Sequence, residues 1–196
     1  LKRLGDFQFV GEQFVKTPLV AKLFLDRVRN RLLAGIEFQY EHIVINPLED
    51  VRTPPLLIRD AEKEEMILQL MEESAFAKTD GGYFLQNEEL EYRFLYYILP
   101  KLQKLTQTYA TTAVRNRIFR ENHKPQIRVK VKKERTNWLE FKFEMDGIPE
   151  REIKDVLQAL EGKRKYYRLH NGSLLSLESK EYEEIPTDKI KIVKCT

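Results

Sequence analysis

The 196-residue chain is long enough for one sizeable domain or two small ones, and 42% hydrophobic with 33% charged residues is the composition of a charge-rich globular protein. No apolar run approaches the ~18 residues of a membrane span, and no signal peptide is visible. The net charge of +3 excludes an argument for nucleic-acid binding from overall basicity. The single cysteine, Cys195, excludes an internal disulfide and fits a reducing, cytoplasmic setting. Because the chain starts at Leu1 and stops abruptly, we expect it to be a piece of a longer polypeptide.

Alternating apolar and polar residues predict several short strands, three of which are joined by tight turns into an antiparallel meander. The meander strands are Leu19 to Leu25, Arg31 to Tyr40 and Ile43 to Ile45. Further strands are expected at residues 1–15, Leu56 to Ile58, Tyr83 to Leu85 and Thr106 to Thr112.

Two helices are predicted between these strands. Asp60 is a natural N-cap for the first helix, which ends near Ser74. Its acidic residues are expected to form a solvated face: Glu62, Glu64, Glu65, Glu72 and Glu73. Asn87 is expected to cap the second helix, whose buried face includes Tyr97 and which Pro100 should kink or shorten.

The C-terminal third is expected to form a strand hairpin, a helix and a second hairpin. A strand from Ile127 to Lys132 is expected to pair antiparallel with Leu139 to Met145, in a register that places Lys132 opposite Glu140. Pro149 opens an amphipathic helix, and Gly162 ends it as a left-handed C-terminal cap. Two short strands then flank the turn dipeptide Asn171-Gly172, and Lys180 to Ile185 is a helical fragment.

These elements predict an α+β fold of antiparallel sheets with helices packed on one face. The break from Asn122 to Pro125 marks a boundary between two subdomains. Residues 1–122 would form an N-terminal α+β subdomain of a meander plus two helices. Residues 123–196 would form the C-terminal subdomain of strand hairpin, helix and hairpin.

Three stretches of this chain carry a resemblance to a known family. The first is F-Q-Y-E-H-I-V-I-N-P-L at Phe38 to Leu48, and the second is I-R-D-A-E-K-E-E at Ile58 to Glu65. The third is K-R-K-Y-Y-R-L-H-N-G-S-L at Lys163 to Leu174, which follows the predicted helix. In order and spacing they resemble the helicase-associated region of bacterial SWI/SNF-family proteins. His170 and Leu174 depart from that pattern, where the family tends to have a charged residue and an aromatic.

The resemblance covers roughly residues 19–178 and implies an accessory domain that precedes an ATP-driven DNA translocase motor. Such a domain would have no catalysis or cofactor of its own. Its implied partners are the motor of the same chain and DNA, with no membrane, and its implied location is the cytoplasm.

The basic residues carry the only functional signal that the residues themselves provide. From Arg115 to Arg135, nine basic residues stand against two acidic ones, a local charge of +7, so the rest of the chain carries −4. Lys and Arg neutralise phosphates, and an exposed tyrosine beside them can stack on an unpaired base. The candidate nucleic-acid-binding residues are Arg115, Arg117, Arg120, Lys124, Lys132, Lys133, Arg135, Lys163, Arg164, Lys165 and Arg168. The alternative is that these side chains are only solvated.

Catalytic and metal-binding motifs are missing from the sequence. There is no G-x-x-x-x-G-K-[ST] loop, no C-x-x-C and no H-E-x-x-H, and His42, His123 and His170 fall in separate predicted loops. We therefore expect no ATPase activity from this segment. Two functions stay open: a nucleic-acid-contacting module, marked by a continuous basic strip, and a docking module for the motor, marked by an exposed apolar patch. An enzyme in its own right is the least favoured.

Overall fold

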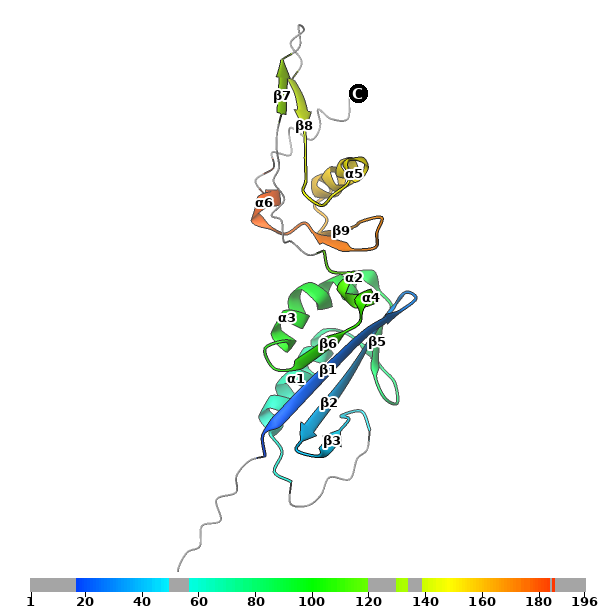
Figure 1. Ribbon diagram of the computed structural model, residues 1–196, viewed down its shortest axis with the longest axis vertical. Coiled ribbons are helices and arrows are strands. Elements are labelled where there is room, and N and C mark those ends of the chain that lie inside the picture. The colour runs from blue at the N-terminus through cyan, green and yellow to red at the C-terminus, as the bar shows by residue number, and fades with distance from the viewer. Residues whose placement is uncertain (1–16, 50–56, 120–129, 134–138, 184, 186–196) are drawn as a thin grey trace, which may run out of the picture.

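The computed structural model describes residues 17–49, 57–119, 130–133, 139–183 and 185, and the expected α+β class is confirmed (Figure 1). Several expectations lie outside the described residues. They are the strand at 1–15, the break at 122–125 and the tail after residue 187. The division into two subdomains at residue 122 therefore stays a prediction.

The predicted meander is the centre of the larger sheet. Strands β1 (Leu19–Val28), β2 (Arg31–Tyr40) and β3 (Ile43–Ile45) pair antiparallel in that order, with Phe24 opposite Gly35. Strand β1 runs three residues past its predicted end. Asp26 and Arg27 prolong it because their side chains bind other elements, Thr111 and Glu91 respectively.

Three further strands complete the larger sheet in the order β4-β5-β2-β1-β6, with β3 also on β2. They are β4 (Ala77–Lys78), β5 (Tyr83–Leu85) and β6 (Gln107–Ala110). Strand β6 lies parallel to β1, unlike the antiparallel pairs elsewhere in the sheet, because the chain crosses the sheet through helices before reaching that edge. The prediction of a short strand at Leu56 to Ile58 is wrong for Leu57 and Ile58, which have irregular structure. Strand β4 is not predicted from the sequence.

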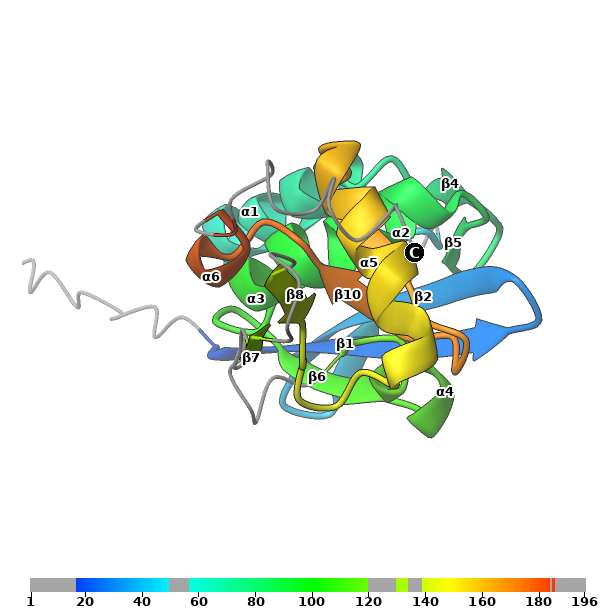
Figure 2. The ribbon, with the colours of Figure 1, turned by 90° about the horizontal axis from the view of Figure 1, so that it is seen from above.

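Helices cover one face of this sheet, as expected. Viewed from above, α1, α2 and α3 lie on the same side of strands β1 and β2 (Figure 2). Helix α1 (Ala61–Glu73) begins where predicted, because the Asp60 side chain accepts a hydrogen bond from the Lys63 amide at 3.3 Å. The inward positions of β1 and β2, Leu23, Leu32 and Phe38 among them, pack with Ile67 and Leu102 of the helices.

The second predicted helix has three parts: α2 (Glu88–Arg93), the π-helical segment η1 (Phe94–Ile98) and α3 (Leu99–Leu102). Pro100 has no amide hydrogen and would clash with the carbonyl four residues earlier. The wider π turn just before it accommodates the ring, since the Leu99 amide bonds to Phe94 O. The extra residue rotates the following side chains. Tyr97 is therefore 44% exposed, against the expectation that it belongs to the buried face.

A small hairpin follows the larger sheet and its helices in sequence. Its strands β7 (Lys130–Lys133) and β8 (Leu139–Lys142) pair antiparallel with Lys132 opposite Glu140, which confirms the predicted register. Strand β8 stops three residues before its predicted end at Met145. Beyond it, Phe143 and Met145 are buried in a second hydrophobic core.

Helix α5 (Glu150–Glu161) supplies Ile153, Val156 and Leu157 to that second core. Its end differs from the expectation, because Gly162 has φ −73° and is not left-handed. The left-handed residue is Lys163, with φ 52°. Its amide bonds to Leu160 O at 2.9 Å, and the Arg164 amide bonds to Ala159 O at 3.0 Å, which is the Schellman pattern one residue later than predicted.

The predicted hairpin around Asn171-Gly172 is confirmed and serves both cores. Strands β9 (Tyr166–Arg168) and β10 (Leu174–Ser176) alternate, so that Leu174 packs in the first core and Leu175 in the second. The short helix α6 (Lys180–Glu183) follows this hairpin in sequence, and the short helix α4 (Thr112–Arg115) follows β6. An isolated bridge joins Ile118, just after α4, to Leu174 of β10, so the hairpin is attached to the segment that follows the larger sheet.

Replacing Lys163 by glycine should stabilise the protein. The left-handed conformation costs a non-glycine residue roughly 1–2 kcal/mol, and the larger unfolded-state entropy of glycine returns part of it. We expect a net gain of about 0.5–1 kcal/mol, seen as a melting temperature ~1–4 °C higher by circular dichroism. Gly172→Ala, at φ 87°, should lower the melting temperature. A lower melting temperature for Lys163→Gly would contradict this assignment of the helix end.

Candidate functional site

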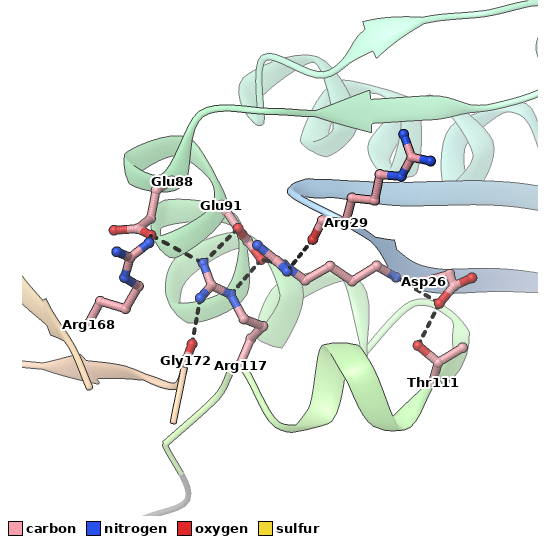
Figure 3. A network of polar contacts seen from close by, with 9 residues as sticks. Asp26, Arg29, Glu88, Glu91, Thr111, Arg117, Arg168 and Gly172 are labelled. Atoms are coloured by element: carbon pink, nitrogen blue, oxygen red, sulfur yellow. Dashed lines mark hydrogen bonds and ion pairs between the residues drawn. The ribbon is translucent and has the colours of Figure 1, made fainter. Parts of the chain in front are cut away.

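A buried ion-pair network joins the larger sheet, helix α2 and the C-terminal hairpin (Figure 3). Arg117 Nε and Nη2 each donate to one oxygen of Glu91, both at 3.0 Å, with 8% and 4% of the two side chains exposed. Arg27 Nε also donates to Glu91, at 3.0 Å. Arg117 Nη1 donates to Gly172 O at 2.5 Å, in the β9–β10 turn. The network therefore fixes the hairpin turn against α2 and β1.

This network removes Arg117 from the candidate phosphate-binding set. Burial alone lowers the pKa of Arg117, but hydrogen bonds and charge from Glu91 and Glu88 outweigh it and raise the pKa, so the guanidinium stays charged. Its Nε, Nη1 and Nη2 atoms all donate to protein oxygens, and with only 8% of the side chain exposed the guanidinium is not accessible to a phosphate. Arg168 is partly committed too, since its Nη1 donates to Glu88 at 3.0 Å, although its side chain is exposed.

The remaining candidates fall into three groups. Lys163, Arg164 and Lys165 are exposed at the end of α5. Arg115 is exposed on α4 and donates to Thr112 Oγ1 at 2.9 Å. Lys132 and Lys133 lie in β7, while Arg120, Lys124 and Arg135 lie outside the described residues. The continuous basic strip that would mark a nucleic-acid-contacting module is expected to join Arg117, Lys133 and Arg164, and Arg117 cannot contribute to it because it is buried.

A polar groove runs between α4 and the β9–β10 turn. Thr112, Arg115, Asn116, Asn171 and Ser173 line its sides, and Ile118 with Phe119 form an apolar wall, around a volume of about 430 Å³. The two sides are held together by backbone hydrogen bonds, Leu174 N to Arg117 O at 2.7 Å and Phe119 N to Leu174 O at 3.4 Å. The groove is thus a fixed feature between two packed elements.

One face of the larger sheet, which none of the described helices covers, is rich in apolar side chains; we call it the open sheet face. Its apolar residues, assigned by strand register, are Val20, Phe24, Val28, Leu33, Val44, Phe84 and Tyr109. Phe24 is 40% exposed, and its ring stacks on that of Tyr109, 50% exposed, at 5.3 Å. Beside them a hollow of about 500 Å³ opens over Gly35, where an added Cβ would meet no atom within 4 Å.

The sequence contains a signal for this face that the strand prediction does not use. In a half-solvated strand, outward positions are polar. Strand β1 places Val20 and Phe24 outward beside Lys22 and Asp26, so its outer row mixes apolar and charged residues. That break in the alternation marks Phe24 as an exposed aromatic from the order of residues alone.

One acidic residue of α1 is buried, contrary to the predicted solvated face. Glu64 accepts hydrogen bonds from Tyr40 Oη at 2.5 Å and from Arg59 Nε at 3.0 Å. Burial first, and then the hydrogen bond to Glu64, raise the pKa of Tyr40 to about 12. Tyr40 Oη also accepts from the Asp60 amide at 2.7 Å. Because Arg59 balances its charge, Glu64 links the helix start to β2 as a structural group.

A tyrosine cluster joins the π-helical segment to the hairpin. Tyr92 is buried, and its ring stacks on Tyr166 at 4.6 Å and tilts against Tyr96 at 4.8 Å. The Tyr92 and Tyr97 hydroxyls both donate to Glu178. Burial, with the nearby carboxylate, raises the pKa of Tyr92. Tyr92 therefore packs the π-helical segment against the hairpin.

A third buried carboxylate, Glu152, holds the hairpin turn on α5. The His170 amide donates to Glu152 Oε2 at 2.9 Å, and His170 Nδ1 lies 3.0 Å from the same oxygen. Burial alone raises the pKa of Glu152, but these contacts with His170 outweigh it and lower the pKa. The ionised carboxylate therefore stabilises the folded state.

Within the described part of the chain, no group of three or more His, Cys, Asp or Glu residues is arranged to hold a metal ion. None of the helices there is both long and apolar enough to cross a bilayer.

A family model described as bacterial SNF2 helicase associated matches residues 1–187, nearly the whole chain. No curated protein and no solved structure matches this chain.

Arg117→Met should destabilise the protein strongly. Removing one partner of a buried ion pair costs 3–5 kcal/mol, and because Glu91 keeps Arg27 we expect about 3 kcal/mol in urea unfolding. The double variant Arg117→Met with Glu91→Leu should recover only part of the loss, because it removes the buried unpaired carboxylate but also takes the partner from Arg27, whose side chain is 21% exposed. A near-wild-type midpoint for Arg117→Met would contradict the structural role.

Glu152 should make stability depend on pH on the acid side. Its pKa is lowered by folding, so its contribution is fully present above the ordinary glutamate value of about 4.3 and is lost as pH falls through the lower folded-state pKa. Glu152→Gln should cost about 1–3 kcal/mol at pH 7, and the difference should shrink in acid. Urea unfolding across pH measures both effects. Glu62→Gln, an exposed first-turn residue of α1, is the control and should change little. An equal loss at every pH would contradict the pKa argument.

Proposed function

Because the chain belongs to the bacterial SNF2 helicase-associated family, we propose that it is a non-catalytic accessory module that docks onto the ATP-driven motor of such a helicase through its open sheet face. The observation that carries this proposal is the stacked Phe24–Tyr109 pair beside the hollow over Gly35. The motor would supply the ATP hydrolysis, and we expect the module to act with it in the bacterial cytoplasm.

Physical reasoning supports docking over simple solvation. Exposed apolar area costs about 25 cal/mol per Å², so a row of outward apolar residues on one sheet face is a cost that a partner surface would remove. Phe24 and Tyr109 each present a ring of the kind that contributes most to binding at protein interfaces. The hollow over Gly35 has room for an apolar side chain from the partner. Lys22 lies opposite Glu37 on the same face, so their charges largely cancel and the face has no strong electrostatic potential of one sign.

The test is binding of the separately produced motor to this chain. Phe24→Glu combined with Tyr109→Glu should weaken binding by at least about tenfold, since aromatic residues at the centre of an interface contribute ~2 kcal/mol or more each. Both side chains point away from the core, so the melting temperature should change little. Calorimetric titration and the ATPase rate of the motor with added module are the two measurements.

Met66→Glu is the matched control, because Met66 is 46% exposed but lies on α1, behind the sheet. It should leave binding unchanged. Equal weakening by Met66→Glu, or full binding by the Phe24 and Tyr109 double variant, would contradict the docking proposal.

A second candidate function is contact with nucleic acid. The exposed run Lys163, Arg164 and Lys165 and the basic sequence from Arg115 to Arg135 favour it, because each cation can neutralise a phosphate. With no recognition helix or zinc finger in the sequence, such contact would be largely indifferent to base sequence.

A further inference from the structure

The groove between α4 and the β9–β10 turn presents hydrogen-bond donors and no acidic group. None of its lining residues, all from the described part of the chain, is a carboxylate. A groove without a carboxylate is notable in a chain in which 31 of the 196 residues are acidic. In the ion-pair network next to the groove, Glu88 and Glu91 are both paired with arginines. Arg27, Arg117 and Arg168 face those two glutamates, and Glu152 behind the turn contacts His170, so the acids behind the groove are engaged by protein groups and none of them lines the groove.

On the α4 side of the groove, the hydrogen bond between Arg115 and Thr112 uses the threonine oxygen as acceptor and leaves other donors of both side chains unused within the described part of the chain. Arg115 Nη2 donates to Thr112 Oγ1 at 2.9 Å, so the threonine oxygen is an acceptor in this contact and keeps its own hydroxyl hydrogen. The contact also holds the guanidinium along the groove. Arg115 Nε and Nη1 donate to no other group among the described residues, so they are available to a ligand.

On the opposite side, the orientation of Asn171 follows from its partners. The Ser173 amide donates to Asn171 Oδ1 at 2.9 Å, and Ser173 Oγ lies 2.7 Å from the same atom. A backbone N–H can only donate, so the atom that it contacts must be the carbonyl oxygen. The amide NH₂ of Asn171 is then the free end, with no acceptor among the described residues, and Asn171 is exposed.

From these contacts we infer that the groove binds a phosphate of a nucleic-acid backbone. Arg115 would provide the charge, and the NH₂ groups of Asn171 and Asn116 would provide neutral donors, the groups that proteins use to hold phosphates without reading bases. The apolar wall of Ile118 and Phe119 suits the sugar between phosphates. The site deepens the nucleic-acid candidate function and is independent of docking, because it shares no residue with the open sheet face.

Fluorescence anisotropy of a labelled DNA oligonucleotide, titrated with the 196-residue chain over a range of salt, tests the site. Non-specific affinity of about 10⁻⁴–10⁻⁶ M is expected. Arg115→Gln should weaken binding about tenfold and reduce the salt slope by roughly one. Arg93→Gln removes the same charge from an exposed position on α2 and should change neither by more than about twofold.

Nuclear magnetic resonance of side-chain amides distinguishes the source of the phosphate. Added DNA should shift the Asn171 and Asn116 NH₂ signals in the parent chain but not in Arg115→Gln. Inorganic phosphate at the same phosphate concentration should shift them far less. Equal shifts with inorganic phosphate would assign the groove to a free anion and overturn the nucleic-acid assignment. Equal losses in Arg115→Gln and Arg93→Gln, or no shift at all, would overturn the site itself. Intact DNA binding by the Phe24 and Tyr109 double variant would keep this result separate from docking.

Discussion

The buried pair of Arg117 and Glu91 is the contact on which the relation between the sheet and the C-terminal hairpin depends. Taking two charges out of water costs several kcal/mol for each ion, and attraction repays that cost only when the remaining donors and acceptors are also satisfied. Here they are, because Glu91 also accepts from Arg27 and Arg117 also donates to Gly172 O. Since these partners come from β1, α2 and the β9–β10 turn, the condition is met only when all three elements are in place.

The two faces of the larger sheet have different physical roles. The inner face is closed by helices and supplies the buried core, with Leu23 and Phe38 fully inside. The outer face adds little to folding, since its side chains stay in contact with water. Apolar residues there need a reason outside the fold, and Phe24 with Tyr109 find none among the described residues beyond each other. The exposed position of these rings is what sets this face apart from an ordinary solvated sheet.

Local patterns in the sequence predict much of the fold. The meander, the Asp60 cap, the hairpin at Asn171-Gly172 and the Lys132–Glu140 register depend on neighbours along the chain, and a single sequence records those. What it does not record is the partner of a charged residue. Arg117 and Glu91 are 26 residues apart, and Glu64 depends on Tyr40, 24 residues earlier. Residue type alone therefore places Arg117 and Glu64 at the surface, although both are buried in the fold.

The open sheet face and the groove between α4 and the β9–β10 turn are close along the chain, which constrains how the two proposed functions would combine. Tyr109 on β6 and Arg115 on α4 are separated by one short connection. That connection is tied down, because Thr111 Oγ1 donates to Asp26 at 2.8 Å and the Thr111 amide donates to Leu25 O at 3.0 Å. A motor seated on Tyr109 would therefore lie beside the groove in a fixed orientation. If each surface binds as proposed, a DNA strand held at Arg115 is presented to the motor at a set distance, and any effect of one ligand on the affinity of the other must be reciprocal.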